Sequence, residues 1–242
     1  MPESARPADA AFAAARDHFS AGLAHLQAGR AAAAEQDLRA SLALLPGRAS
    51  TLTNLAVALL QLGRPADALR CLDEVLAQAP QDVEALGHRG LALNRLQRCA
   101  EAAAVFEQLL QLAPQRPEAW FHLAQTRQLL DQPAAALDAY DRCLALRPLH
   151  AASWSQRGTA LRELGRSDDA AASFERALAL GDDDDGLTAY YLAAVRGGTP
   201  PARAPDGYVK RLFDDYAADF DQHLVDSLGY CAPERLQRLV IG

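Results

Sequence analysis

The chain has 242 residues, of which 50% are hydrophobic and 23% are charged, a composition that predicts a folded protein. Its formal net charge of −7 argues against nucleic acid or a membrane surface as the partner. No apolar run approaches the roughly 18–20 residues of a membrane span, and we expect no signal peptide because a cationic start and an apolar core are missing. The four widely spaced cysteines favour a reducing, cytoplasmic location. The bias towards Ala, Leu and Arg hints at a GC-rich bacterial genome.

A short motif recurs along most of the chain. The segments LALLPGR, LAQAPQD, LQLAPQR and LALRPLH place four prolines 34 residues apart, at Pro46, Pro80, Pro114 and Pro148. One further step reaches Asp182, where the proline is lost but the preceding apolar pattern persists. A fixed period of this length is typical of a repeat architecture built from pairs of helices.

Other positions share the same period. Each expected second helix contains an alanine followed four residues later by a large apolar residue, and each expected first helix contains one small residue. Trp120 and Trp154 occupy an aromatic position of the first helix, where Leu52 and Leu86 replace them. Together these positions resemble the tetratricopeptide pattern W-x2-L-G-x2-Y…A-x3-F…P. The three sets are Ala34, Ala68, Ala102, Ala136 and Ala170; Leu38, Leu72, Phe106, Tyr140 and Phe174; and Gly22, Ala56, Gly90, Ala124 and Gly158.

The resemblance implies an all-α, right-handed tetratricopeptide (TPR) solenoid of about five helix-turn-helix repeats within residues 1–198. Gly29, Gly63 and Gly165 are expected to end first helices. The segment LTAYYLAAVRG predicts a capping helix. GGTPPARAP predicts a linker, followed by C-terminal helices. The expected boundaries are 15–48, 49–82, 83–116, 117–150 and 151–184 for the repeats, 186–197 for the cap, 199–207 for the linker and 208–242 for the remainder.

In TPR proteins the first helices line a concave groove that usually holds the ligand, so the resemblance places a protein or peptide partner there. Four polar residues at the sixth repeat position form a candidate hydrogen-bonding ladder for an extended peptide: Asn54, His88, His122 and Gln156. Alternatively, these residues are solvated or bond a neighbouring helix. Ser20 holds this position in the first repeat. The neighbouring residues suit an apolar peptide or a segment of the protein itself: Phe19, Leu23, Thr53, Val57, Leu91 and Phe121.

Three other kinds of site are not expected. His88 and His122 lack a third metal ligand at a recognised spacing. The acidic run GDDDDG lacks the alternating ligands and closing glutamate of a calcium loop. TPR modules that grip the acidic C-termini of chaperones use lysine and asparagine where this chain has Phe19 and Leu23.

The segment YVKRLFDDYAADFDQHLVDSLGY differs from everything before it and predicts an amphipathic helix. Residues 208–236 resemble the segment F-D-x-Y-A-x-x-F-D-x-x-L that precedes the catalytic domain in a family of bacterial TPR methyltransferases. By that resemblance, the residues of a lid over S-adenosylmethionine are Phe213, Tyr216, Phe220 and Asp221.

No glycine-rich cofactor turn follows before Gly242. We therefore expect no catalytic residues, no enzyme activity and no cofactor in this chain, with S-adenosylmethionine bound only where a catalytic domain is attached. The favoured hypothesis is an interaction module that recruits a partner or substrate for such a methyltransferase domain. The alternative is a stand-alone adaptor with no methyltransferase role. The apolar face of the C-terminal segment predicts docking on the last repeats or self-association through the C-terminal helices.

Overall fold

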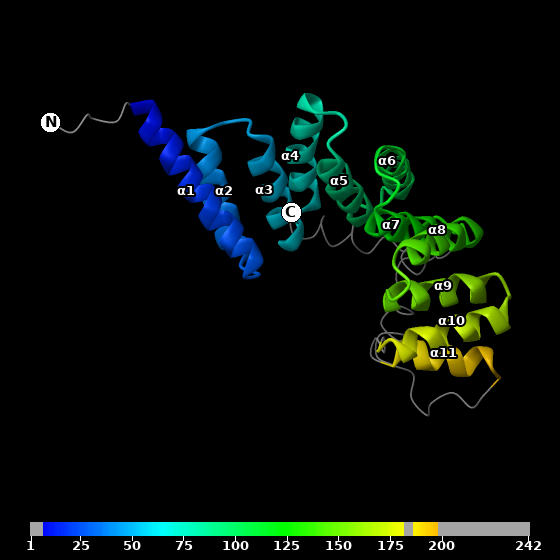
Figure 1. Ribbon diagram of the computed structural model, residues 1–242. Helices are drawn as coiled ribbons and strands as arrows, with labels where there is room; N and C mark the ends of the chain where they lie inside the picture. The colour runs from blue at the N-terminus through cyan, green and yellow to red at the C-terminus, as the bar shows by residue number, and fades with distance from the viewer. Residues whose placement is uncertain (1–6, 182–185, 198–242) are drawn as a thin grey trace, which may run out of the picture.

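The structure is a computed structural model that describes residues 7–181 and 186–197. These residues form eleven α-helices and no strand, and the helices succeed one another along an arc (Figure 1). The prediction of an all-α solenoid of paired helices is confirmed. The expected linker at 199–207 and the lid candidates Phe213, Tyr216, Phe220 and Asp221 lie outside the described residues.

The helices form five consecutive pairs and a final single helix. The pairs are α1 (Pro7–Gln27) with α2 (Ala31–Leu44), α3 (Ala49–Gln61) with α4 (Pro65–Gln78), α5 (Val83–Arg95) with α6 (Cys99–Leu112), α7 (Pro117–Leu129) with α8 (Pro133–Leu146), and α9 (Ala151–Glu163) with α10 (Ser167–Ala179); α11 (Leu187–Val195) follows. Within the described residues, no helix combines the length and the apolar character needed to cross a bilayer.

The turn inside each pair uses one left-handed residue. Gly29, Gly63 and Gly165 have φ angles of 69°, 70° and 73°, so their predicted role is confirmed. The same repeat position is filled by Gln97 with φ of 59° and by Asp131 with φ of 54°. The sequence pattern did not reveal these two, because neither residue type marks a left-handed turn as glycine does.

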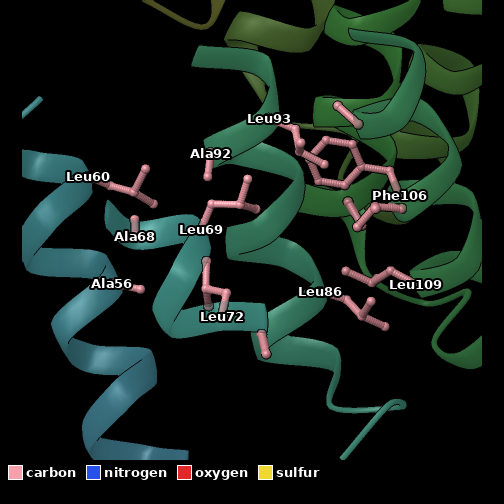
Figure 2. Packing of buried hydrophobic residues seen from close by; sticks show 14 of the residues in the cluster. Ala56, Leu60, Ala68, Leu69, Leu72, Leu86, Ala92, Leu93, Phe106 and Leu109 are labelled. Atoms are coloured by element: carbon pink, nitrogen blue, oxygen red, sulfur yellow. The ribbon is translucent and has the colours of Figure 1, made fainter. Parts of the chain in front are cut away.

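Small residues on the first helices allow the paired helices to approach closely. A Cβ atom added to Gly90 would lie 2.5 Å from Cζ of Phe106, and one added to Gly158 would lie 2.6 Å from Cε1 of Phe174. Figure 2 shows Phe106 beside Leu93, where α5 and α6 meet. The alternation of small and large residues read from the sequence is therefore the packing rule of the core.

Adjacent repeats are joined by packing and by hydrogen bonds. The indole Nε1–H groups of Trp120 and Trp154 each donate to a proline carbonyl of the preceding repeat, Pro114 and Pro148 respectively, at 2.9 Å. In the described part of the chain, each first helix contacts the next first helix, whereas the second helices scarcely contact one another. The solenoid therefore bends towards its first helices, and α3, α5, α7 and α9 line the concave side.

Candidate functional site

A pocket of about 580 Å³ opens on the concave side between α5, α7 and α9. Leu91 and Leu129 give it apolar surface, and the charged residues Arg95 and Glu163 also line it. Its distinguishing feature is a set of side-chain amides from three successive first helices, and we refer to it as the amide pocket. The amides belong to Asn94, Gln125, Gln128 and Gln156.

Neighbouring side chains fix several of these amides at one end. The buried Tyr140 hydroxyl donates to Oε1 of Gln128 at 2.6 Å, and Nδ1 of His122 lies 3.1 Å from Oε1 of Gln125. Each glutamine therefore keeps an Nε2 group that can donate elsewhere. Asn94 shows the opposite arrangement, because its Nδ2 donates to Oγ1 of Thr126 at 2.7 Å while its buried Oδ1 has no partner among the described residues. The two glutamines thus offer donors to the pocket, whereas the unpaired oxygen of Asn94 is enclosed beneath its surface.

A second, smaller pocket of about 230 Å³ lies beside the amide pocket, and we refer to it as the Gly87 pocket. Phe106 and Leu109 of α6 form apolar parts of its lining. His122 and Leu91 line both pockets, so the two are neighbours on the same surface.

Two histidines border the Gly87 pocket. Burial lowers the pKa of His88 and of His122 below the ordinary value of 6.5. The ring of His122 stacks on Phe106 with 5.9 Å between centroids. Both imidazoles are therefore neutral at pH 7.

A third pocket of about 210 Å³ occupies the corresponding place in the next repeat, between α7 and the turn before α9. Phe121 and Cys143 line it. The Cys143 thiol is buried, lies 3.2 Å from Oγ of Ser153, and has a raised pKa because of its burial. A buried thiol with a raised pKa is a packing group rather than a nucleophile.

The structure brings together three of the residues predicted for the ladder. His88 and His122 line the Gly87 pocket, and Gln156 lines the amide pocket with His122. Asn54 instead donates its side-chain amide to the carbonyl of Ser50 in its own helix at 2.8 Å. The ladder as a peptide-binding device stays a prediction.

The other predicted groove residues differ in their exposure. Phe19 and Phe121 are half-buried and pack against the core. Thr53 is half-buried, and Ser20 is exposed on α1. Among the described residues, no group of three or more His, Cys, Asp or Glu side chains is placed to hold a metal ion.

Sequence reasoning missed the three amides that accompany Gln156: Asn94, Gln125 and Gln128. A signal was present on α7, where His122, Gln125 and Gln128 follow one another at intervals of three residues. Residues at this spacing share a helix face. The ladder pattern, by contrast, marks a single position of each repeat as ligand-facing.

The paired helices and the concave pockets define a helical-repeat scaffold. A family model described as tetratricopeptide repeat matches residues 53–117, 95–127 and 123–185, which together span more than half of the 242 residues. The chain therefore belongs to the tetratricopeptide repeat family, whose solenoids are scaffolds for protein–protein interaction.

Solved structures share this fold. MamA 41-end from Desulfovibrio magneticus RS-1 has a TM-score of 0.64 and 20% identity, with 71% of this chain and 97% of that chain covered. TTC0263, a thermophilic TPR protein in Thermus thermophilus, has a TM-score of 0.61 and 22% identity, with 76% and 100% covered. Identities this low show the fold alone. A search of curated protein sequences gave no match.

Proposed function

We propose that the concave side of α5, α7 and α9 binds an extended segment of a partner protein. The observation that carries this proposal is the amide pocket, to which three successive first helices contribute side-chain amides. An extended peptide presents backbone N–H and C=O groups in alternation, and side-chain amides can satisfy both kinds. The volume of about 580 Å³ also falls within the range of about 300–1,000 Å³ typical of ligand pockets.

The pocket is suited to backbone recognition because its polar groups are already oriented. The bonds to Tyr140 and His122 hold Gln128 and Gln125 before a ligand arrives. A held side chain loses little conformational freedom on binding, which favours affinity. Gln156 completes the surface from α9.

Selection from a random-peptide display library tests the proposal. Affinities of the selected peptides are measured by fluorescence anisotropy for the wild type and for the double variant Gln125→Ala/Gln156→Ala. Each lost hydrogen bond contributes about 0.5–1.5 kcal/mol, so we expect the affinity to fall about tenfold or more. The melting temperature should stay nearly unchanged.

Asn54→Ala is the matched control, because the Asn54 amide bonds within its own helix and lines neither pocket. This variant should bind the selected peptides as the wild type does. Failure to select any peptide, or equal affinities for the wild type and the double variant, would contradict groove binding.

We infer a finer role from the segment at residues 208–236, which resembles the region preceding the catalytic domain of bacterial TPR methyltransferases. In this role the solenoid recruits a partner or substrate for an attached S-adenosylmethionine-dependent methyltransferase domain. The alternative is a stand-alone cytoplasmic adaptor. Reading the gene beyond the codon for Gly242 separates them: a following strand and glycine-rich turn support the methyltransferase role, and their absence favours the adaptor.

A calorimetric titration of the 242-residue chain with S-adenosylmethionine adds an independent measurement. We expect no saturable heat, because a lid helix supplies only part of a cofactor site and the glycine-rich turn is not in the sequence. Saturable binding would overturn the assignment of Phe213, Tyr216, Phe220 and Asp221 to a lid that needs a further domain.

A further inference from the structure

Gly87 differs from the other glycines inside the first helices. A Cβ atom added to Gly22, Gly90 or Gly158 would lie only 2.5–2.7 Å from a side chain of the paired helix, so packing requires glycine there. A Cβ atom added to Gly87 would meet only Cδ1 of Leu109, at an ordinary contact distance of 3.5 Å. Glycine inside a helix is destabilising relative to alanine. Packing therefore does not explain why this position lacks a side chain.

The missing side chain leaves room for another one. The Gly87 pocket has a volume of about 230 Å³ and an apolar lining that includes Leu91, Phe106 and Leu109. At the same position one repeat later, the chain carries Phe121, whose ring packs against Tyr140 with 6.0 Å between centroids. A side chain from a bound molecule can take the place in the third repeat that Phe121 fills in the fourth.

The charges around the pocket are already paired. Arg116 bonds Glu84 at 2.6 Å, and Arg147 bonds Glu118 at 2.9 Å. Both carboxylates that line the pocket in the described part of the chain therefore already have a cationic partner. An uncharged side chain is the matching occupant, because burying an unpaired charge is unfavourable.

The position of the Gly87 pocket joins it to the amide pocket. His122 lines both, and its neutral imidazole adds no charge at the boundary. An extended peptide whose backbone crosses the amide pocket projects its side chains to either side. One of these side chains reaches the Gly87 pocket beside it.

We propose that the Gly87 pocket binds one large, uncharged apolar side chain, of leucine to phenylalanine size, from the peptide that occupies the amide pocket. The inference rests on the proposed function and adds the side-chain preference of the peptide site. Burying such a side chain is expected to raise the affinity between about tenfold and a hundredfold over the same peptide with alanine.

Peptide sets with random flanks and one fixed central residue test the inference. The fixed residue is Leu, Phe, Ala, Glu or Lys, and affinities are measured by fluorescence anisotropy. We expect the wild type to bind the Leu and Phe sets at least about tenfold more tightly than the Ala, Glu and Lys sets. The Gly87→Phe variant fills the pocket and should bind all five sets at the level of the Ala set.

Thr53→Phe is the matched control, because it places the same ring at the same repeat position of α3, outside the Gly87 pocket. It should keep the preference for Leu and Phe. If the wild type binds all five sets equally while Gln125→Ala/Gln156→Ala loses binding, the inference is overturned and the proposed function stands. If neither Gly87→Phe nor Gln125→Ala/Gln156→Ala changes binding, the inference and the proposed function are both overturned.

A second measurement applies if Gly87→Phe does not fold. N-acetyl-leucinamide and the amide of N-acetyl-glutamate are titrated into the ¹⁵N-labelled wild-type chain, and the Gly87 amide resonance is followed. A saturable shift with the leucine derivative alone supports the inference. Equal shifts with both derivatives, or none with either, overturn it.

Discussion

The third and fourth repeats have the same helices and similar surface charges, yet the third has a glycine at the repeat position where the fourth carries a phenylalanine ring. In the fourth repeat, Phe121 lies edge-on to Tyr140 and to His150, with centroid distances of 6.0 and 5.1 Å. In the third repeat, Gly87 places no ring beside Phe106 and lines a pocket of about 230 Å³, whereas the pocket of about 210 Å³ in the fourth repeat has the Phe121 ring in its lining. A single side chain therefore decides whether the pocket of a repeat is lined by the repeat's own ring or has room for one from a bound molecule.

The electrostatic setting of the two repeats is alike. Glu84 pairs with Arg116 in the third repeat, and Glu118 pairs with Arg147 in the fourth. Both pairs are more than two-fifths exposed and add little stability. The difference between the repeats is consequently the size of the side chain at this position, Gly87 or Phe121.

Removing the ring from the fourth repeat should produce the largest effect. Phe121→Ala deletes a half-buried ring that packs against the core, so we expect a loss of about 2–3 kcal/mol in the free energy of unfolding. Urea denaturation measures it. Phe121→Leu keeps most of the volume and should lose less than half as much. A negligible loss in Phe121→Ala would mean that the ring contributes little to the packing of this repeat.

Adding a methyl group to Gly90 of the third repeat should also lower the free energy of unfolding. Gly90→Ala places a Cβ atom 2.5 Å from the Phe106 ring, and overpacking of this kind destabilises by about 1–3 kcal/mol. Denaturation by urea again gives the value. The double variant Gly90→Ala/Phe106→Leu should recover part of the loss, and unchanged stability in the single variant would contradict the packing rule.

The turns of the third and fourth repeats offer a comparison in which both should respond alike. Gln97 and Asp131 have φ angles of 59° and 54° and stand where the other repeats have glycine. Either residue replaced by glycine relieves left-handed strain, so each variant should be stabilised by about 1 kcal/mol. Thermal unfolding measures the gain. Gly63→Gln in the second repeat is the reverse control and should be destabilised.

A methyl group at the other glycine of α5 should have the opposite sign to Gly90→Ala. Gly87→Ala fits at 3.5 Å from Leu109 and removes a helix-interior glycine, so we expect a gain of about 0.5–1 kcal/mol. Urea denaturation of the two alanine variants side by side gives the contrast. Destabilisation by Gly87→Ala would show that the pocket is already filled by packing.

Acidification should slightly lower the stability of the folded protein through the two histidines that line the Gly87 pocket. Burial depresses the pKa of His88 and His122 below 6.5, opposed at His88 by Glu84 and Asp82 and at His122 by the bond to Gln125 and by Glu118. A depressed histidine pKa means that the folded state disfavours protonation, so stability is fully present above pH 6.5 and decreases as the pH falls through the folded pKa values.

The same protonation places charge beside the pocket and should weaken the preference for peptides with a central Leu or Phe. Thermal unfolding and anisotropy between pH 7 and pH 5 measure the two effects. His88→Gln should reduce both pH dependences. Arg116, His150 and the carboxylates named above also border these histidines. A pH dependence unchanged in His88→Gln would exclude His88 as its source.

The fold could be predicted almost entirely from the sequence, because most of its packing contacts join residues that are close together in the sequence. Gly90 and Phe106 lie in one helix pair, and the 34-residue period repeats their contact along the chain. Such contacts join residues at fixed short separations, so a periodic pattern is enough to predict them. The helix pairs follow directly from that pattern.

The candidate site was only partly predictable. His88, His122 and Gln156 were found because they share one repeat position, whereas Asn94, Gln125 and Gln128 lie at others. Asn54 shares the position of the first three but bonds its own helix. Repeat position alone does not say which way a polar side chain turns, since its partner can lie in its own helix, as for Asn54, or in a neighbouring helix, as for Asn94 and Gln128.

The sequence by itself determined the period, the helix pairs and the residue types that let paired helices approach. The tertiary structure decided that Gly87 and Gly90, three residues apart in α5, have different roles: one opens a pocket and the other contacts a ring. The reason is that a pocket is the volume left by side chains from several helices. That volume depends on how α5, α6 and α7 stand relative to one another, which no single segment of the sequence specifies.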